Sequence, residues 1–332
     1  MKLNTMVAAL ALAIPVRAAS MAGIVSVEKI WDGAPHCAFT DLTRHEGKWF
    51  CTFREGAGHV PVLVGDQQKD GAIRVLSSPD GRKWSSTALL TEPTMDLRDP
   101  HFSTTPDGRL MIVMGGSLYV GDRYFDRQSR VSFSKDGITW TPVQPILADG
   151  DWLWRVTWHQ GRAYGVSKRV PGKNNPRLPK RGNLVTSTDG VHWNTITELA
   201  VPGIDEATVI FGEGGEMQIL VRRESDNNHA WIGRSAPPYT QWRWNDCGQQ
   251  VGGPNLVRIP GHGLWAGGRT YPARKTGLAE IVNGRYMPKL VFPSGGDNSY
   301  PGFVWHDGVL WMSYYSSHEA RTAIYLAKVS FD

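Results

Sequence analysis

The sequence has few cysteines and, beyond its first twenty residues, no long apolar run. Cys37, Cys51 and Cys247 are odd in number and form no C-x-x-C pair, which disfavours a disulfide framework and a cysteine metal or redox site. We therefore expect buried free thiols. The sequence also lacks H-E-x-x-H, a P-loop and a G-x-G-x-x-G between strand and helix, which disfavours zinc proteases, nucleotide hydrolases and dinucleotide-dependent enzymes.

The N-terminus has the pattern of a secretory signal. Lys2 precedes the apolar run 6–14, and Val16-Arg17-Ala18 offers a small-residue cleavage site. The run is too short to span a bilayer, so we expect residues 1–18 to be removed, no membrane insertion, and a secreted or periplasmic protein. A frayed apolar terminus is the alternative. Loss of Lys2 and Arg17 lowers the formal net charge from +5 to +3, which does not indicate a nucleic-acid partner.

Helical periodicity is also missing, and a repeated turn takes its place. No stretch keeps a 3.6-residue apolar period, whereas 37 glycines and 21 prolines separate short strand-like runs. The pattern S-x-D-G-x-x-W covers residues 78–84, 134–140 and 187–193, with its aspartates 56 and 53 residues apart. Asp-Gly favours a tight turn, and the tryptophan can bury a large face against a neighbouring unit. Three copies at this spacing indicate a repeat architecture.

A second periodicity supports the first. Glycine turns, each followed by a strand-like run, fall at Gly47, Gly108, Gly161, Gly215, Gly263 and Gly308. Six units of about fifty residues predict an all-β fold, a six-bladed β-propeller of four-stranded blades. The segment Ile24–Ile30 could pair with the last blade and close the ring. A β-sandwich, the alternative, gives no reason for this period. Because no linker interrupts the chain, we expect residues 19–332 to form one domain and the protein to be a monomer.

A propeller brings matching positions of its blades to one end of the ring. Two sets of residues should lie at the end of the ring opposite the glycine turns. The starts of the strands that precede the turns carry Asp99, Arg155, Glu206, Asn255 and Tyr300. The ends of the strands that follow the turns carry Arg54, Lys168, Arg222 and Arg269. Arg54, Arg222 and Arg269 occupy equivalent positions in the first, fourth and fifth units. Since guanidinium groups bind carboxylates bidentately, a common mouth should hold an anion. Salt bridges at the surface or between blades are the alternative.

The S-x-D-G-x-x-W turn resembles the Asp box of the sialidase (neuraminidase) superfamily, and the resemblance spans most of residues 36–330. It implies a propeller of sialidase type and an exo-glycosidase that removes terminal, acidic sugars from glycans. Glu206 followed by Arg222 is similar to the family's glutamate and carboxylate-binding arginine. Tyr300, after the Gly/Ser-rich loop 294–299, is placed like the family's nucleophile.

The resemblance extends to further site residues. Asp99 in Arg98-Asp99-Pro100 is similar to a substrate-contacting aspartate, and a third arginine falls on Arg269 or Arg274. The family's acid/base aspartate belongs in the loop between Arg54 and Ser78. His59, Asp66 and Asp70 are the candidates for this role in the loop. We favour Asp66 because of its distance from the first S-x-D-G-x-x-W turn.

The first blade departs from the family pattern. Sialidases carry F-R-I-P there, and its arginine belongs to their carboxylate-binding triad, whereas residues 35–39 read P-H-C-A-F. Arg54 ends the following strand and could still reach the mouth. This departure leaves the sugar open, so a glycosidase for a non-sialic sugar and a non-catalytic carbohydrate-binding propeller are the alternatives. The resemblance implies no metal and no organic cofactor.

The chemistry of these residues suits an anionic sugar. A tyrosine hydroxyl with a pKa of about 10 needs a base to act as nucleophile, which Glu206 could be for Tyr300. Sialidases are an exception to the two-carboxylate rule of glycoside hydrolysis, and a separate acid must protonate the leaving oxygen. The alternatives are that Tyr300 packs between blades and that Glu206 only pairs with Arg222.

Two further features bear on the substrate. A basic run without an acid would attract acidic glycans if it lies at the mouth, and a solvated loop is the alternative; its members are Lys168, Arg169, Lys173, Arg177, Lys180 and Arg181. Trp154 and Trp158 are the tryptophans that we expect near the mouth, where they could stack on a sugar.

Overall fold

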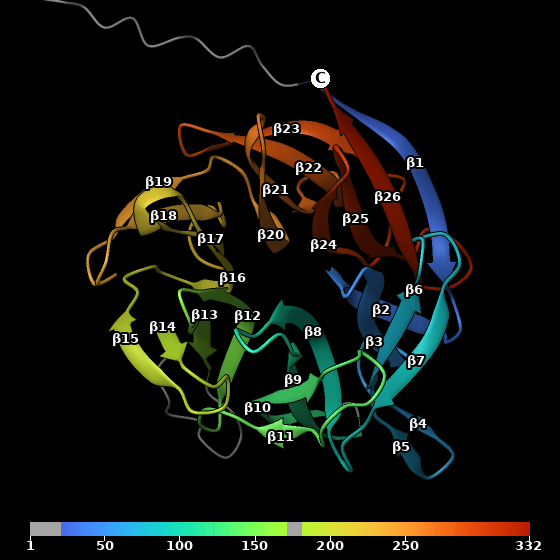
Figure 1. The fold of residues 1–332 in the computed structure, drawn as a ribbon. Helices are drawn as coiled ribbons and strands as arrows, with labels where there is room; N and C mark the ends of the chain where they lie inside the picture. Colours follow the sequence, from blue (N-terminus) through green and yellow to red (C-terminus); the bar gives the residue numbers. More distant parts are fainter. Residues whose placement is uncertain (1–20, 122, 171–180) are drawn as a thin grey trace, which may run out of the picture.

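The computed structural model describes residues 21–121, 123–170 and 181–332, and its strands form a ring of six blades (Figure 1). The signal predicted over residues 1–18 therefore lies outside the described residues. Each blade is a four-stranded antiparallel sheet whose first strand lies nearest the ring axis. The predicted six-bladed β-propeller is confirmed.

The first three blades follow one another along the chain. Blade 1 comprises β2 (His36–His45), β3 (Lys48–Gly56), β6 (Ala72–Ser78) and β7 (Ser85–Leu90). Blade 2 comprises β8 (Asp96–Thr104), β9 (Leu110–Val120), β10 (Arg123–Ser134) and β11 (Gln144–Pro145). Blade 3 comprises β12 (Asp151–His159), β13 (Arg162–Arg169), β14 (Arg181–Ser187) and β15 (Asn194–Glu198).

The remaining strands complete the ring. Blade 4 comprises β16 (Ile204–Phe211), β17 (Met217–Arg223), β18 (Trp231–Ser235) and β19 (Arg243–Asp246), with the 3₁₀ turn η1 (Glu213–Gly215) after β16. Blade 5 comprises β20 (Val251–Ile259), β21 (Gly263–Thr270), β22 (Lys275–Val282) and β23 (Arg285–Val291). Blade 6 comprises β24 (Asn298–His306), β25 (Val309–Ser316), β26 (Ala323–Phe331) and β1 (Ala22–Trp31). A separate hairpin, β4 (Val62–Val64) and β5 (Gln67–Lys69), projects from blade 1.

The two ends of the described chain, near Ala22 and Phe331, meet in blade 6. Strand β1 pairs antiparallel with β26, and Ala22 lies opposite Phe331 (Figure 1). This pairing closes the ring as the sequence predicted for Ile24–Ile30, because it supplies blade 6 with its outer strand. Side chains also join blade 1 to blade 6, where the rings of Trp49 and Trp311 lie 4.2 Å apart.

All six inner strands carry a one-residue β-bulge at the same level. In each inner strand, an advance of three residues between paired positions corresponds to an advance of two residues in the neighbouring strand. The bulged pairs are Phe39–Thr40, Asp99–Pro100, Trp154–Arg155, Asp205–Glu206, Gly253–Pro254 and Tyr300–Pro301. Phe39, Asp99, Gly253 and Tyr300 adopt positive φ there. A bulge re-aims side chains, so this level of the ring is where the strands turn residues toward the axis.

The three S-x-D-G-x-x-W turns lie at the opposite end of the ring and share one set of hydrogen bonds. In the first, Ser78 Oγ accepts from the Gly81 amide at 2.8 Å, and Asp80 Oδ1 accepts from the Arg82 amide at 2.9 Å. The register Trp49↔Ser78 places this turn at the end where β3 begins. The same Ser and Asp bonds recur in the other two turns.

The glycine of each turn packs on the preceding blade. A Cβ added at Gly81 would lie 2.5 Å from the Trp311 ring, and one at Gly137 would lie 2.2 Å from the Phe50 ring. Gly190 likewise approaches Met111. The repeated turn therefore joins neighbouring blades, and its glycine is required both for positive φ and for this close approach.

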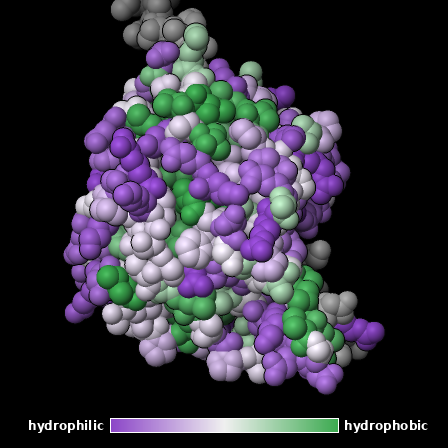
Figure 2. Space-filling view, turned by 90° about the vertical axis from the view of Figure 1, so that its right-hand side faces the viewer, coloured by the Kyte–Doolittle hydropathy of each residue, from purple (hydrophilic) through white to green (hydrophobic). Residues whose placement is uncertain are grey.

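One outer side of the ring is mainly polar. On the side that carries β1 and β7, hydrophilic residues cover most of the surface and apolar residues form separate patches (Figure 2). Within the described residues, no helix is long and apolar enough to cross a membrane. Cys37, Cys51 and Cys247 are free and buried, as expected.

Gly137→Ala tests the packing role of the repeated turn. Gly137 and Gly108 both have positive φ, 72° and 81°, but nothing lies within 4 Å of a Cβ at Gly108. Gly108→Ala should cost about 1–2 kcal/mol from backbone strain alone. Gly137→Ala should cost about 1–3 kcal/mol more, because its methyl group meets Phe50. Urea unfolding of both variants measures the difference, and equal losses would contradict the account.

Candidate active site

A pocket of ≈ 160 Å³ opens at the end of the ring where the bulges lie. Four of its lining residues come from the bulges of blades 1, 2, 4 and 6, namely Phe39, Asp99, Glu206 and Tyr300. The second blade adds Arg98, Ser117, Tyr119 and Arg127, the third adds Trp152 and Lys168, and the loop after β3 adds His59. Residues far apart in sequence thus meet because the bulges occupy one level of the ring.

Tyr300 and Glu206 form a hydrogen-bonded pair in this pocket. The phenol hydroxyl donates to Glu206 Oε1 at 2.6 Å. Glu206 Oε2 accepts from Arg222 Nη1 at 2.9 Å and from the Gly253 amide at 2.8 Å. Arg222 and the Gly253 amide therefore hold Oε2 of the carboxylate, and Oε1 faces the phenol of Tyr300.

The surroundings of Tyr300 keep its phenol protonated and fixed. Burial, followed by the negative charge of Glu206, raises the pKa of Tyr300 well above its usual value. Its ring packs on Phe39 at 5.1 Å and on Trp154 at 5.3 Å between centroids. A Cβ at Gly253 would lie 2.5 Å from the phenol ring, so only glycine leaves room for the ring in this position.

Asp99 is the pocket acid that can exchange a proton near neutrality. It occupies the bulge of β8 with φ of 50°. Burial, opposed by the charge of Arg98 and aided by that of Glu206, raises the pKa of Asp99 to about 6. A carboxylic acid with this pKa can donate a proton and take it back in the same pH range.

Arg54 does not lie free at the pocket. It is fully buried, and its Nε donates to Asp96 Oδ1 at 3.1 Å while Nη1 donates to the Gly58 carbonyl at 2.7 Å. The prediction that Arg54 binds a substrate anion is therefore wrong, because its guanidinium group is already enclosed by protein acceptors.

The other predicted arginines do not converge in the pocket either. Arg222 donates to both Glu206 and Glu224, so its fork is taken by two carboxylates. Arg269 Nη1 lies 3.4 Å from Asp297 Oδ1, outside the pocket lining. Arg274 is exposed on the turn after β21 and lines a separate, open hollow.

Asp66 also lies away from the pocket. It is exposed at the turn between β4 and β5, in the hairpin that projects outward from blade 1 (Figure 1). This hairpin carries the middle of the loop away from the ring axis, which overturns the choice of Asp66 as the acid. Asp70 accepts a hydrogen bond from Gln68 instead. Of the three candidates in this loop, His59 is the one among the pocket residues.

Arg127 is a pocket residue that the sequence reasoning missed. Its guanidinium group lies over Trp152 at 5.0 Å and over Tyr124 at 4.7 Å, and Nε donates to the Tyr124 hydroxyl at 2.7 Å. Arg98 and Lys168, the other pocket cations, pair with Asp96 and Asp205. Across the part of the chain that the structure describes, no ion pair of Arg127 is found. It lies on a third strand, where no sequence motif marks it.

The aromatic and basic expectations are met unevenly. Trp154 is buried between Tyr300 and His101, and Trp158 belongs to an interblade core, whereas the unpredicted Trp152 lines the pocket. Within the basic run, Lys168 lines the pocket and Arg169 pairs with Asp151. The run's other residues up to Lys180 lie outside the described ranges, and Arg181 pairs loosely with Glu198.

A larger hollow, ≈ 1120 Å³, lies at the outer edges of blades 4 and 5. Glu216 is the one acid among its lining residues, and it accepts a hydrogen bond from Gln218. The hydrolysis that the sequence resemblance implies needs at least an acid and a nucleophile or base, so the smaller central pocket is the better candidate active site.

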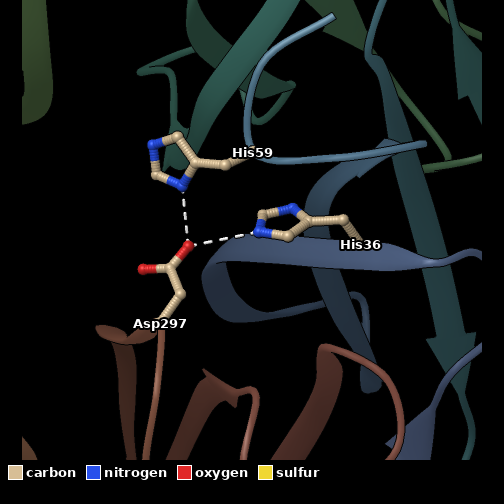
Figure 3. A group of neighbouring side chains, drawn as sticks. All are labelled: His36, His59 and Asp297. Atoms are coloured by element: carbon tan, nitrogen blue, oxygen red, sulfur yellow. Dashed lines mark hydrogen bonds and ion pairs between the residues drawn. The ribbon is translucent and has the colours of Figure 1, made fainter. Parts of the chain in front are cut away.

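A group of possible metal ligands lies beside the pocket (Figure 3). His36 Nε2 and His59 Nδ1 lie 3.1 Å and 2.7 Å from Asp297 Oδ2. The two imidazoles come from the start of β2 and the loop after β3, and the carboxylate comes from the loop before β24.

Comparisons with known proteins show the fold. No protein-family model and no curated protein matches the sequence. A protein of unknown function from Dyadobacter fermentans DSM 18053 has a TM-score of 0.77 at 17% identity, covering 94% of this chain and 99% of that chain. An α-L-arabinofuranosidase of Fusarium graminearum, in complex with an iminosugar inhibitor, has a TM-score of 0.68 at 13% identity, covering 92% and 97%.

A sialidase also resembles this chain in structure. A Trypanosoma rangeli sialidase mutant that displays trans-sialidase activity has a TM-score of 0.67 at 13% identity, covering 94% of this chain and 60% of that chain. The structural neighbours thus include both a sialidase and an arabinofuranosidase. At these identities they establish the propeller fold, and their activities remain statements about those proteins.

Asp99→Asn tests the electrostatics of the pocket. A carboxyl group whose folded pKa is raised favours folding fully only below its unfolded pKa, and this contribution is lost as the pH rises through about 6. The variant's stability relative to the wild type should therefore improve by up to about 3 kcal/mol between pH 4 and pH 8. Urea unfolding at several pH values measures this. A difference that does not change with pH would contradict the burial of a titrating Asp99.

Proposed function

We propose that the protein is an exported exo-glycosidase that removes a terminal, anionic sugar from glycans, with Tyr300 as nucleophile and Glu206 as its base. The observation that carries this proposal is the 2.6 Å hydrogen bond from the phenol to Glu206 Oε1 inside a pocket. The phenol is protonated at rest, so attack requires a base in contact with it, and Glu206 is in contact. The signal-like N-terminus supports export.

Asp99 is the acid of this proposal in place of Asp66. In the first step the phenol oxygen attacks the anomeric carbon and its proton passes to Glu206, while Asp99 protonates the leaving oxygen. In the second step the Asp99 carboxylate takes a proton from water, which displaces the tyrosine, and Glu206 returns its proton to the phenolate. Two displacements retain the anomeric configuration. The pKa of about 6 suits a residue that acts first as acid and then as base.

The pocket indicates the size and charge of the sugar. Its ≈ 160 Å³ is below the range of about 300–1,000 Å³ typical of sites for larger ligands, which favours a single terminal residue over an internal oligosaccharide segment. Arg127 supplies a planar, stacked guanidinium group within the lining, and such a group pairs with carboxylates. This arginine takes the role that the sequence suggested for Arg54, Arg222 and Arg269 or Arg274.

Tyr300→Phe tests the catalytic assignment. A screen of sialosides, uronides and neutral glycosides first identifies a substrate that the wild type hydrolyses. Removal of the phenol oxygen should then lower kcat about 10³-fold or more while sugar binding persists. Tyr314→Phe is the matched control, because Tyr314 is buried in the same blade and its hydroxyl donates to the Pro293 carbonyl, outside the pocket. Unchanged turnover of Tyr300→Phe, or a wild type that binds sugars and releases none, would refute the proposal.

Arg127→Met tests the charge of the substrate. Loss of a charge-assisted hydrogen bond of about 1.5–3 kcal/mol should raise KM for a carboxylated glycoside about tenfold to a hundredfold. The KM for the matching glycoside without a carboxylate should stay unchanged. If KM rises equally for both glycosides, Arg127 does not recognise the carboxylate of the substrate, and a neutral sugar becomes the better assignment.

A further inference from the structure

Three ligand-type side chains converge beside the pocket, and the hydrolysis mechanism uses none of them. The ligand atoms of His36, His59 and Asp297 all lie within 4.8 Å of one another. Figure 3 shows both imidazoles pointing at the same carboxylate oxygen. They come from three separate segments, so the fold brings them together, and no local sequence pattern does.

We propose that His36, His59 and Asp297 bind one divalent transition-metal ion of the zinc type. Two imidazole nitrogens and one carboxylate oxygen are ligands that Zn²⁺ takes at about 2.0–2.2 Å. Ligand atoms around a tetrahedral ion then lie about 3.3 Å apart. The distances of 2.7 Å and 3.1 Å to Oδ2 are close to this value, so small shifts of the side chains would admit the ion.

The surroundings hold the carboxylate in a suitable orientation. Asp297 Oδ1 accepts a hydrogen bond from the Tyr315 hydroxyl at 2.8 Å, and Arg269 Nη1 lies 3.4 Å from the same oxygen. Protein donors thus occupy Oδ1 and leave Oδ2 to the two imidazoles. Hydrogen bonds of this kind to a ligating carboxylate orient it toward a metal.

The location gives the ion a possible role in the proposed reaction. His59 also lines the pocket, and its ring lies 5.3 Å from that of Phe39, which in turn packs on Tyr300. Three protein ligands leave a coordination position open. The ion would therefore add positive charge at the edge of the pocket and offer a position to an oxygen atom of the sugar. The binding of the metal does not require that the proposed hydrolysis be correct.

Zinc titration of the full chain tests this proposal directly. After treatment with a chelator and its removal, isothermal titration with Zn²⁺ should show one site at micromolar or tighter affinity. His59→Ala should weaken binding at least about tenfold. His59 is more than half exposed in its side chain, so its removal leaves the core intact. Cobalt loaded into the same protein should give the visible absorption of a tetrahedral site, and His59→Ala should abolish it.

His192→Ala is the matched control for this titration. His192 is exposed and pairs with Asp189 at 2.7 Å, which reproduces one imidazole–carboxylate contact without the second imidazole. Its removal should leave the zinc affinity and the cobalt spectrum unchanged. Thermal unfolding of the metal-free proteins checks that both variants fold. Absence of stoichiometric zinc binding, or equal binding by His59→Ala and the wild type, would overturn the proposal and indicate a hydrogen-bonded bridge between two loops.

Discussion

The structure depends on a single extra residue in every inner strand. A plain β-strand alternates its side chains between two faces, so it could not present consecutive residues to the axis of the ring. The bulges at Asp99, Asp205–Glu206 and Tyr300 break this alternation at the same level in three blades. The positive φ of Asp99 and Tyr300 is the backbone strain that this placement requires, and the surrounding sheets hold it. The pairing of β1 with β26 closes the ring that carries the six bulges.

Buried charges near the axis are compensated in pairs. Glu206 contacts Arg222, Arg54 contacts Asp96, and Arg155 Nη1 contacts Asp41 Oδ1 at 2.9 Å. A buried charge without a partner would be strongly destabilising, so these pairs explain why so many arginines can enter a propeller core. They also explain why counting arginines does not reveal a binding site. Arg54 and Arg222 have carboxylate partners, whereas Arg127 is stacked on aromatic rings and lines the pocket.

The sequence predicted the fold more fully than the site. The fold could be predicted because the S-x-D-G-x-x-W turn and the regularly spaced glycines mark turns that recur from blade to blade. The pairing of Ile24–Ile30 with the last blade followed from the need to close the ring. Tyr300 and Glu206 could be placed together because both open inner strands. Arg127 and Trp152 could not be found in this way, since their approach to the pocket depends on strand twist and packing that no local motif encodes. The prediction for Asp66 failed because no sequence pattern in its loop indicated the β4–β5 hairpin, which projects outward.

The proposed chemistry therefore rests on one contact between blades 4 and 6, the hydrogen bond from Tyr300 to Glu206. The most direct measurement is mass spectrometry of the protein after reaction with a fluorinated glycoside that traps a covalent intermediate. The account predicts a single sugar adduct on the peptide that contains Tyr300, with retention of configuration in the released product. An adduct on Asp99 or Glu206, or a product of inverted configuration, would contradict it.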